Sequence, residues 1–371
     1  MTSDPALRRL AAQLCAAVAL LILYGSWFPF EWIRPDRVDL AWALADTRLW
    51  TGRADLLGNV ALFLPWGLVA ALAAQAQGRS ALGWSLGSGL ALALLAQAGQ
   101  FFEAQRDPRW ADVLWNGVGA GAGWALAPLL PRLRGRADTL LLAGSMLVAW
   151  LPLWPSLDPM RLQAHWQPLT ELGAWQGPEA AMMAALALIA GAAGAALDPR
   201  RPVLAIVLAG MLLLAGQMFV PGTRLSGGGA IGVAAGLALA MALHRRPRAV
   251  AVALLLLQLL GGLAPFDFGV TRQVFHWLPF EALLGGTMLG NVQVLARDAW
   301  LWGAALWFAR RGGGSLPAWT LACATTAAVV EVVQCWMPSR AADLTPPLIV
   351  LGLGWLATRY TTLVEFSERT R

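Results

Sequence analysis

Two stretches of the sequence carry polar and charged side chains at matching spacings inside an otherwise apolar chain. In chain order they read Gln97-x2-Gln100-x5-Arg106-x2-Arg109-x2-Asp112-x3-Asn116 and Glu331-x2-Gln334-x5-Arg340-x2-Asp343. The first two residues of each stretch are three apart, so on a helix each pair faces one way. Amide, carboxyl and guanidinium groups gathered in this way could bind a polar ligand or act as an acid or base.

The first stretch has side chains suited to an anionic ligand. Asp112 and Asn116 are four residues apart at the start of a predicted helix, so they share a face, and a carboxylate there can cap the helix. Arg106 and Arg109 precede them in a predicted extracytoplasmic loop, where guanidinium groups suit the phosphate of an envelope lipid. The alternative is structural: the Arg side chains bridge two helices through charge-assisted hydrogen bonds.

Glu331 is the most informative charge, because we expect it five to six residues inside the outer end of an apolar helix. A charge at the centre of a membrane costs roughly 2.5–3.5 kcal/mol on insertion scales and usually faces a partner or a cavity. Glu331 could form a polar pocket with Gln334 and Arg340, or a structural clamp that closes a helix hairpin. Asp55 and Asn59 could line the same kind of pocket or cap their helix. The predicted ligand-binding set is Asp55, Asn59, Gln97, Gln100, Arg106, Arg109, Asp112, Asn116, Glu331, Gln334, Arg340 and Asp343.

The composition places these residues in a membrane protein. Of 371 residues, 58% are apolar and 13% charged, whereas a soluble domain is about half apolar and a quarter charged. The net charge of +6 comes from short Arg clusters between apolar stretches, a pattern typical of membrane topology rather than of a nucleic-acid-binding face. Cys15, Cys323 and Cys335 have no metal-ligand or redox spacing. We expect no cofactor, no metal and no nucleic-acid partner.

The apolar stretches predict about twelve transmembrane helices. They cover residues 10–28, 56–74, 81–102, 113–130, 139–156, 180–197, 202–220, 228–243, 249–265, 292–309, 317–337 and 344–358. Arg residues exceed acids in one set of loops and acids exceed Arg in the other, so the positive-inside rule places both termini in the cytoplasm. For Arg297 and Asp298, we expect a satisfied ion pair near the membrane interface. We therefore predict an all-α, multi-pass protein of the inner membrane.

The chain also repeats. Gln100, Gln217 and Gln334 recur at equal intervals, each near the outer end of the third helix of a group of four. A regular period indicates repeated units, and units with an even number of spans keep one orientation, so these are parallel repeats. The predicted architecture is three parallel four-helix repeats: residues 1–137, a degenerate second unit at 138–246, and residues 247–371.

The combined pattern resembles the VanZ-like membrane protein family. That family has a Glu-x2-Gln turn followed by Arg, Asp, a further Asp, Asn and Gly, and an upstream segment matched here by Asp55-x3-Asn59-x3-Phe63-x-Pro65-x-Gly67. Gln97 replaces the family's Glu, Arg109 its first Asp and Pro346 the second Asp of the third unit. The resemblance implies a bacterial protein of the cell envelope. The founding member is associated with low-level teicoplanin resistance, so a link to glycopeptide resistance is a further expectation.

Three functions follow as hypotheses. The leading one is a non-enzymatic membrane protein that binds, or helps to move, a lipid-linked or amphiphilic envelope component through an outward-facing polar pocket, with membrane lipid or a lipid-linked precursor as its partner. The second is a membrane-embedded enzyme that uses Glu331, Asp112 or Asp55 as an acid or base. The third is a scaffold of an envelope complex in which the Arg motif is purely structural. No Ser/His/Asp order, zinc-protease or phosphate-loop motif favours the enzyme.

Overall fold

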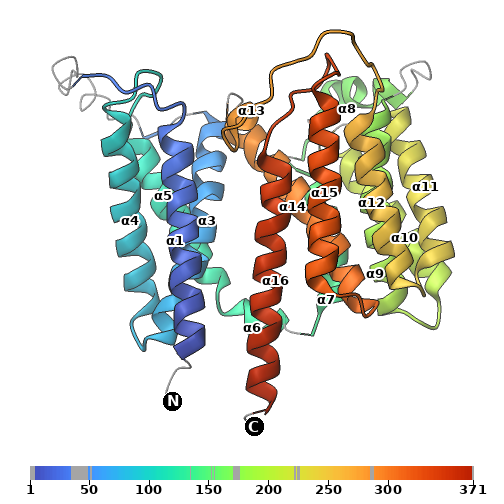
Figure 1. The fold of residues 1–371 in the computed structure, drawn as a ribbon, viewed down its shortest axis with the longest axis horizontal. Helices are drawn as coiled ribbons and strands as arrows, with labels where there is room; N and C mark the ends of the chain where they lie inside the picture. The colour runs from blue at the N-terminus through green and yellow to red at the C-terminus, as the bar shows by residue number, and fades with distance from the viewer. Residues whose placement is uncertain are drawn as a thin grey trace. The chain divides into compact units, whose positions relative to one another are not determined.

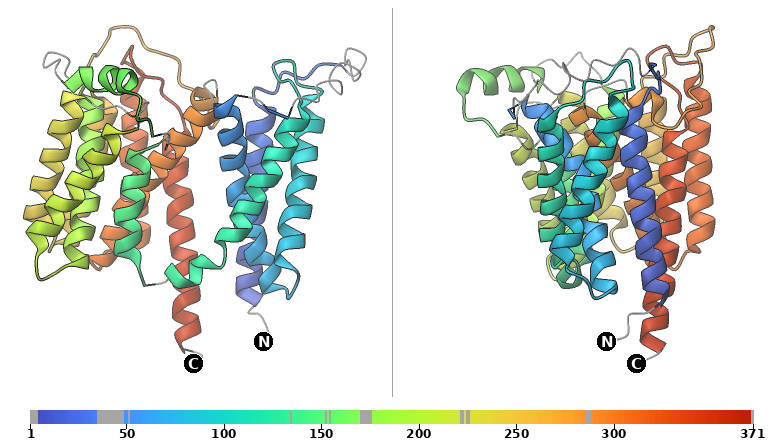
Figure 2. Two further views of the ribbon diagram at one scale, coloured as in Figure 1. Left: turned by 180° about the vertical axis from the view of Figure 1, so that it is seen from behind. Right: turned by 90° about the vertical axis from the view of Figure 1, so that its left-hand side faces the viewer.

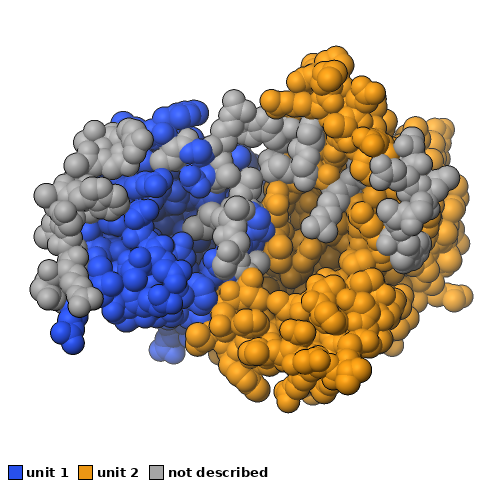
Figure 3. Space-filling view, turned by 90° about the horizontal axis from the view of Figure 1, so that it is seen from above, with its two compact units in different colours: residues 1–134, 283–292, 362–371 blue, residues 135–282, 293–361 orange. Residues whose placement is uncertain are grey.

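The protein is an all-α membrane protein. A computed structural model describes residues 5–34, 49–50, 52–133, 135–151, 153, 155–169, 176–220, 223, 226–284 and 288–369. The chain divides into two compact units, coloured separately in Figure 3. Unit 1 comprises residues 1–134, 283–292 and 362–371, and unit 2 comprises residues 135–282 and 293–361.

Four long helices of unit 1 stand side by side (Figures 1 and 2). They are α1 (Pro5–Trp27), α3 (Arg53–Ala76), α4 (Ala81–Gln100) and α5 (Trp110–Leu126), followed by the short α6 (Leu129–Leu133). Their shared core contains Ile22 of α1, Phe63 of α3 and Leu92 of α4. This packing brings the start of α5 beside the start of α3 and the end of α4, where the polar residues of the first stretch lie.

Unit 2 contains the remaining long helices. They are α7 (Ala137–Ala149), α9 (Gly177–Leu197), α10 (Pro202–Met218), α11 (Gly227–Leu243), α12 (Pro247–Leu263), α14 (Met288–Arg311), α15 (Leu316–Gln334) and α16 (Thr345–Arg369), with shorter α8 (Pro159–Trp166), η2 (Gln167–Leu169) and α13 (Glu281–Leu284). The first residues of α14 and the last of α16 fall in unit 1. The central helix is α9, which contacts α7, α10, α11 and α12 and is buried along most of its length. Its all-round apolar surface suits that position.

Glycines allow two helix pairs to approach closely. A side chain on Gly119 or Gly123 of α5 would collide with the main chain of α3 at Val60 or Leu64. In unit 2, a side chain on Gly232 or Gly236 of α11 would likewise collide with the main chain of α9. Small residues spaced four apart are the usual means by which membrane helices pack backbone to backbone.

Five helices within the described residues are long and apolar enough to cross a membrane: Arg8–Trp27, Asp55–Ala76, Ala81–Gln100, Gly177–Leu197 and Leu316–Gln334. Other predicted spans coincide with shorter apolar helices, such as Pro202–Met218 and Gly227–Leu243. Some ends differ from the prediction. The predicted span 139–156 is a helix only to Ala149, and the span 113–130 is interrupted after Leu126. The all-α membrane class is confirmed, and the count of twelve spans stays a prediction.

Candidate functional site

The first polar stretch forms a hydrogen-bonded cluster in unit 1. Asn59 of α3 donates from Nδ2 to Oδ1 of Asp112 at 2.7 Å, and Gln97 of α4 donates from Nε2 to the other carboxylate oxygen at 3.5 Å. Gln97 also accepts at Oε1 from the main-chain N–H of Arg109, at 2.8 Å. Three helices therefore meet at Asp112 through side chains that the sequence singled out.

Two further predicted residues lie on the same helices. Asp55 is exposed in the first turn of α3. Asn116 is buried one turn after Asp112 in α5, and its Oδ1 has no hydrogen-bond partner among the described residues. Neither donates to or accepts from Asp112, so the cluster consists of Asn59, Gln97, Arg109 and Asp112.

Arg106 and Gln100 fasten the loop after α4 to the end of α1. Arg106 donates from Nε to the carbonyl of Phe28 at 2.9 Å and from Nη2 to that of Gly25 at 3.3 Å. Gln100 donates from Nε2 to the carbonyl of Ser26 at 3.1 Å. The guanidinium group of Arg106 is thus held by main-chain oxygens, which is the arrangement expected of the structural alternative.

The second polar stretch makes the same bonds in unit 2. Arg340 donates from Nε to the carbonyl of Ala264 at 3.1 Å and from Nη2 to that of Gly261 at 2.8 Å. Gln334 donates to the carbonyl of Gly262 at 2.8 Å. Glu331 takes the place of Gln97, because its Oε2 accepts from the main-chain N–H of Asp343 at 2.8 Å.

The middle of the chain has part of this arrangement. Gln217 of α10 donates to the carbonyl of Ala149 at the end of α7 at 3.3 Å, as Gln100 donates to the end of α1 and Gln334 to the end of α12. Trp150 donates from Nε1 to the carbonyl of Leu213 at 3.0 Å, and Trp27 donates in the same way to Ala96 at 3.1 Å. One residue with a positive φ follows each of α1, α7 and α12 at a matching place: Phe30 at 69°, Leu153 at 59° and Phe266 at 63°. Arg224 follows Gln217 by seven residues, much as Arg106 follows Gln100 by six, and it lies outside the described residues.

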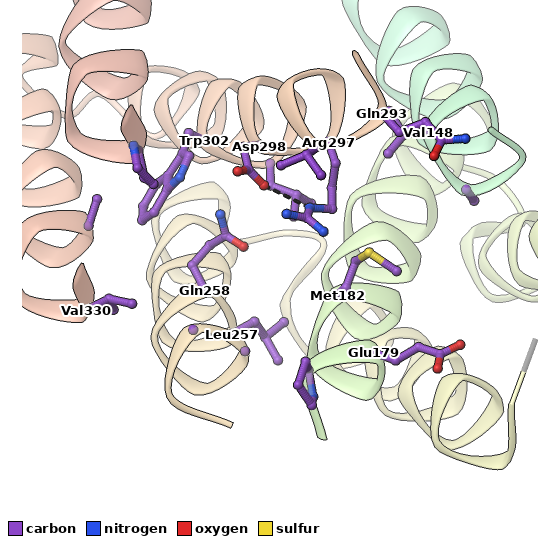
Figure 4. A pocket seen from close by; sticks show the side chains of 18 of the residues that line it. Val148, Glu179, Met182, Leu257, Gln258, Gln293, Arg297, Asp298, Trp302 and Val330 are labelled. Atoms are coloured by element: carbon purple, nitrogen blue, oxygen red, sulfur yellow. Dashed lines mark hydrogen bonds and ion pairs between the residues drawn. The ribbon is translucent and has the colours of Figure 1, made fainter. Parts of the chain in front are cut away.

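A cavity of about 350 Å³ lies among the helices of unit 2 (Figure 4). It is lined by residues of α7, α9, α10, α12, α14, α15 and α16 and of the loops that hold Thr223 and Arg340. Figure 4 shows Arg297 and Asp298 reaching from α14 into this space, where Gln258 of α12 reaches toward them. The polar and charged lining residues are Glu179, Gln217, Thr223, Gln258, Gln293, Arg297, Asp298, Glu331, Gln334 and Arg340.

Three of the predicted site residues line this cavity: Glu331, Gln334 and Arg340. Asp343 bonds to Glu331 but does not line it. The remaining predicted residues belong to unit 1, where Asn59, Gln97, Arg109 and Asp112 form the separate cluster. The cavity lies among helices assigned to the second and third predicted repeats.

Sequence reasoning missed several lining residues. Glu179 is 3% exposed in the first turn of α9, and Gln258 and Gln293 are half-buried on α12 and α14. For Glu179 and Gln258 the available signal was a lone polar residue in an apolar stretch, which in a membrane helix points to a partner or cavity. The pairing of Arg297 with Asp298 was predicted and is confirmed, with Nε donating to Oδ1 at 2.8 Å.

Asp343 lies outside the helices, in the loop before α16. Burial raises the pKa of Asp343, while hydrogen bonds from Thr345 and the charge of His276 act in the opposite direction. The main-chain N–H of Thr345 donates to Oδ1 at 2.5 Å. This carboxyl group therefore accepts the first N–H of α16, and it gives up its proton less readily than an ordinary Asp side chain.

Residues 11–131 match the family model described as VanZ/LLP1. This part of the chain is VanZ-like. The VanZ-like segment holds α1, α3, α4 and α5 with the whole Asp112 cluster. The resemblance expected for residues 247–371 lies outside the matched range. Comparison with curated proteins gave no match, and comparison with solved structures gave none.

Proposed function

We propose that this VanZ-type membrane protein binds an amphiphilic or lipid-linked component of the cell envelope in the cavity of unit 2. The observation that carries the proposal is the cavity itself, with ionisable and amide groups among helices that are otherwise apolar. Polar side chains buried at membrane depth usually face a ligand or water pathway. The apolar lining residues Met182, Leu257 and Trp302 would accommodate the non-polar part of an amphiphile.

Two variants on one helix test this proposal. Gln258→Trp places a large side chain in the cavity, whereas Leu256→Trp changes a residue of α12 that is 54% exposed and does not line it. The lipids that remain with the purified protein in mild detergent are measured by mass spectrometry. We expect Gln258→Trp to reduce the retained amphiphile several-fold and Leu256→Trp to leave it unchanged. Equal retention by wild type and both variants would contradict the proposal.

We also propose the finer architecture in which twelve helices span the inner membrane as three parallel repeats at 1–137, 138–246 and 247–371. The support is the recurrence of the Gln-to-carbonyl bond at Gln100, Gln217 and Gln334, and of the Arg bonds at Arg106 and Arg340. Both termini would be cytoplasmic and both Arg loops extracytoplasmic. Reporter fusions after residues 106 and 340 test this topology, because a cytoplasmic reporter at either place would overturn it.

A link to glycopeptide resistance depends on the family resemblance alone. Under the proposed function it would require that the bound amphiphile influence the drug target at the outer surface. Deletion of the gene from its host, followed by measurement of teicoplanin susceptibility, tests that expectation. The Gln258→Trp variant in the same host shows whether any effect depends on the cavity.

A further inference from the structure

The ionisable groups that line the cavity of unit 2 include more carboxyls than guanidinium groups. Glu179, Asp298 and Glu331 contribute carboxyls, and Arg297 and Arg340 contribute guanidinium groups. In a medium of low dielectric constant the sign of this balance matters, because charges interact far more strongly there than in water. The lining therefore favours a ligand with positive charge over a simple anion.

Both guanidinium groups already have partners. Arg297 donates to Asp298 within the cavity, so this pair contributes little net charge. Arg340 donates to the carbonyls of Gly261 and Ala264, which fixes its planar group against the end of α12. Arg340 therefore does not offer the open, two-pronged face that guanidinium groups present to phosphate, and the charge of Arg297 is balanced by Asp298.

Acceptor atoms, by contrast, are available. Glu331 is 7% exposed and uses Oε2 for the N–H of Asp343, while its Oε1 has no hydrogen bond or ion pair within the described residues. The amide groups of Gln258 and Gln293 also make no hydrogen bond to any described residue, although both line the cavity. A deeply buried carboxylate is stabilised by a cation or by hydrogen-bond donors.

We infer that the amphiphile bound in this cavity carries a primary amine in its headgroup. The inference rests on the proposed function and narrows its ligand class. An ammonium group has three donors and a positive charge, which matches the free oxygen of Glu331 and the amide oxygens of Gln258 and Gln293. A headgroup with only phosphate and hydroxyl groups would bring no positive charge to Glu331.

Glu331→Gln tests the negative charge of Glu331 separately from its hydrogen bond with the N–H of Asp343. In unit 1 a glutamine already stands at the equivalent place: Gln97 accepts from the N–H of Arg109 at 2.8 Å, the distance that Glu331 has to Asp343. The variant therefore keeps an acceptor for that N–H and removes only the negative charge. Asp158→Asn is the matched control, since it removes a carboxylate of unit 2 that is 47% exposed and lies outside the cavity.

The test compares three lipids in competition on the full-length protein in detergent, read by native mass spectrometry. The probes are phosphatidylethanolamine, its N-acetylated form and phosphatidylglycerol. The N-acetylated form keeps the phosphate but lacks the positive charge of the amine. We expect wild type and Asp158→Asn to retain phosphatidylethanolamine about tenfold better than either other lipid, as a charge-assisted hydrogen bond provides. Glu331→Gln should retain all three about equally.

Two results would overturn the inference while leaving the proposed function intact. One is equal retention of the three lipids by wild type, with all three displaced by Gln258→Trp. The other is an undiminished preference for phosphatidylethanolamine in Glu331→Gln. Retention that is indifferent to Gln258→Trp for every lipid would instead remove the proposed function, and the amine inference with it.

Discussion

Gln97 and Glu331 occupy the same structural place in different units of the chain: each side-chain oxygen accepts, at 2.8 Å, the main-chain N–H twelve residues further on. In both cases that N–H lies in the polar stretch that follows the helix. The shared acceptor explains why an amide and a carboxyl group can stand at one position of the motif. The difference in charge between them distinguishes the unit with the cavity from the VanZ-like segment.

The first prediction concerns this acceptor. Glu331→Leu leaves the buried N–H of Asp343 without a partner, which costs about 1–3 kcal/mol, whereas Glu331→Gln preserves the bond. We expect a lower midpoint of thermal unfolding in detergent for the Leu variant only. Gln97→Leu should lower the midpoint in the same way, because the N–H of Arg109 then loses its side-chain acceptor. Equal midpoints for Glu331→Leu and Glu331→Gln would show that the bond contributes nothing.

The second prediction concerns the bonds of Arg106 to two carbonyls. A lysine at this position can reach the carbonyl of Phe28 or that of Gly25, but its single ammonium lacks the fixed fork that serves both. Arg106→Lys should therefore destabilise unit 1 by about 1–3 kcal/mol, and Arg340→Lys should do the same in unit 2. Thermal unfolding of the purified variants measures this. An unchanged unfolding midpoint in Arg106→Lys would show that one of the two hydrogen bonds is enough for stability.

The third prediction concerns the close contact between α3 and α5. Gly119→Ala places a methyl group against the main chain of Val60, so the helices must separate, at a cost of about 1–3 kcal/mol. Gly121→Ala, on the same helix, meets only the side chain of Leu86 at 3.4 Å and should be tolerated. Folded yield and the midpoint of thermal unfolding, measured for both variants, test this difference. Similar values for the two variants would argue against the packing.

The fourth prediction concerns pH and Asp343. Its pKa is raised by burial above the ordinary value of 3.8, so the native state binds this proton more tightly than the unfolded state does. The resulting stability is present at low pH and is lost as the pH rises through the raised pKa. Asp343→Asn keeps an acceptor for the N–H of Thr345 and removes the charge.

We therefore expect Asp343→Asn to be more stable than wild type at neutral pH, and the difference to vanish at about pH 4. Unfolding midpoints of both proteins across that range measure the effect. A variant that is less stable than wild type at neutral pH would show that the ionised carboxylate stabilises the loop.

Much of the helical architecture could be predicted from the sequence, because long apolar segments between Arg-rich loops have few other stable forms in lipid. The register of the motif could also be predicted. The repeat predicts that Gln100 and Gln334 lie near the ends of helices, and both donate to the end of a neighbouring helix. The hydrogen-bond partners of Arg106 and Arg340 could not be predicted, because they are main-chain carbonyls, which every residue type has.

The cavity was beyond sequence reasoning for a different reason. Glu331 indicated a polar pocket, but the residues that share it come from α9, α12 and α14, which lie far apart in the chain. Glu179 and Gln258 each stand as one polar residue in an apolar stretch, whereas Gln293 lies near other polar residues of α14. Nothing in their local spacing indicates that the three line one space. Only the packing of unit 2 around α9 brings them together.

The most direct test of the central claim is a cryo-EM map of the full-length protein in nanodiscs made from lipids of its host. We expect density for one amphiphile in the cavity of unit 2, with its polar end at Glu331 and Gln258 and its non-polar part along Leu257 and Trp302. A map in which these side chains contact one another directly, with no space for a ligand, would contradict it.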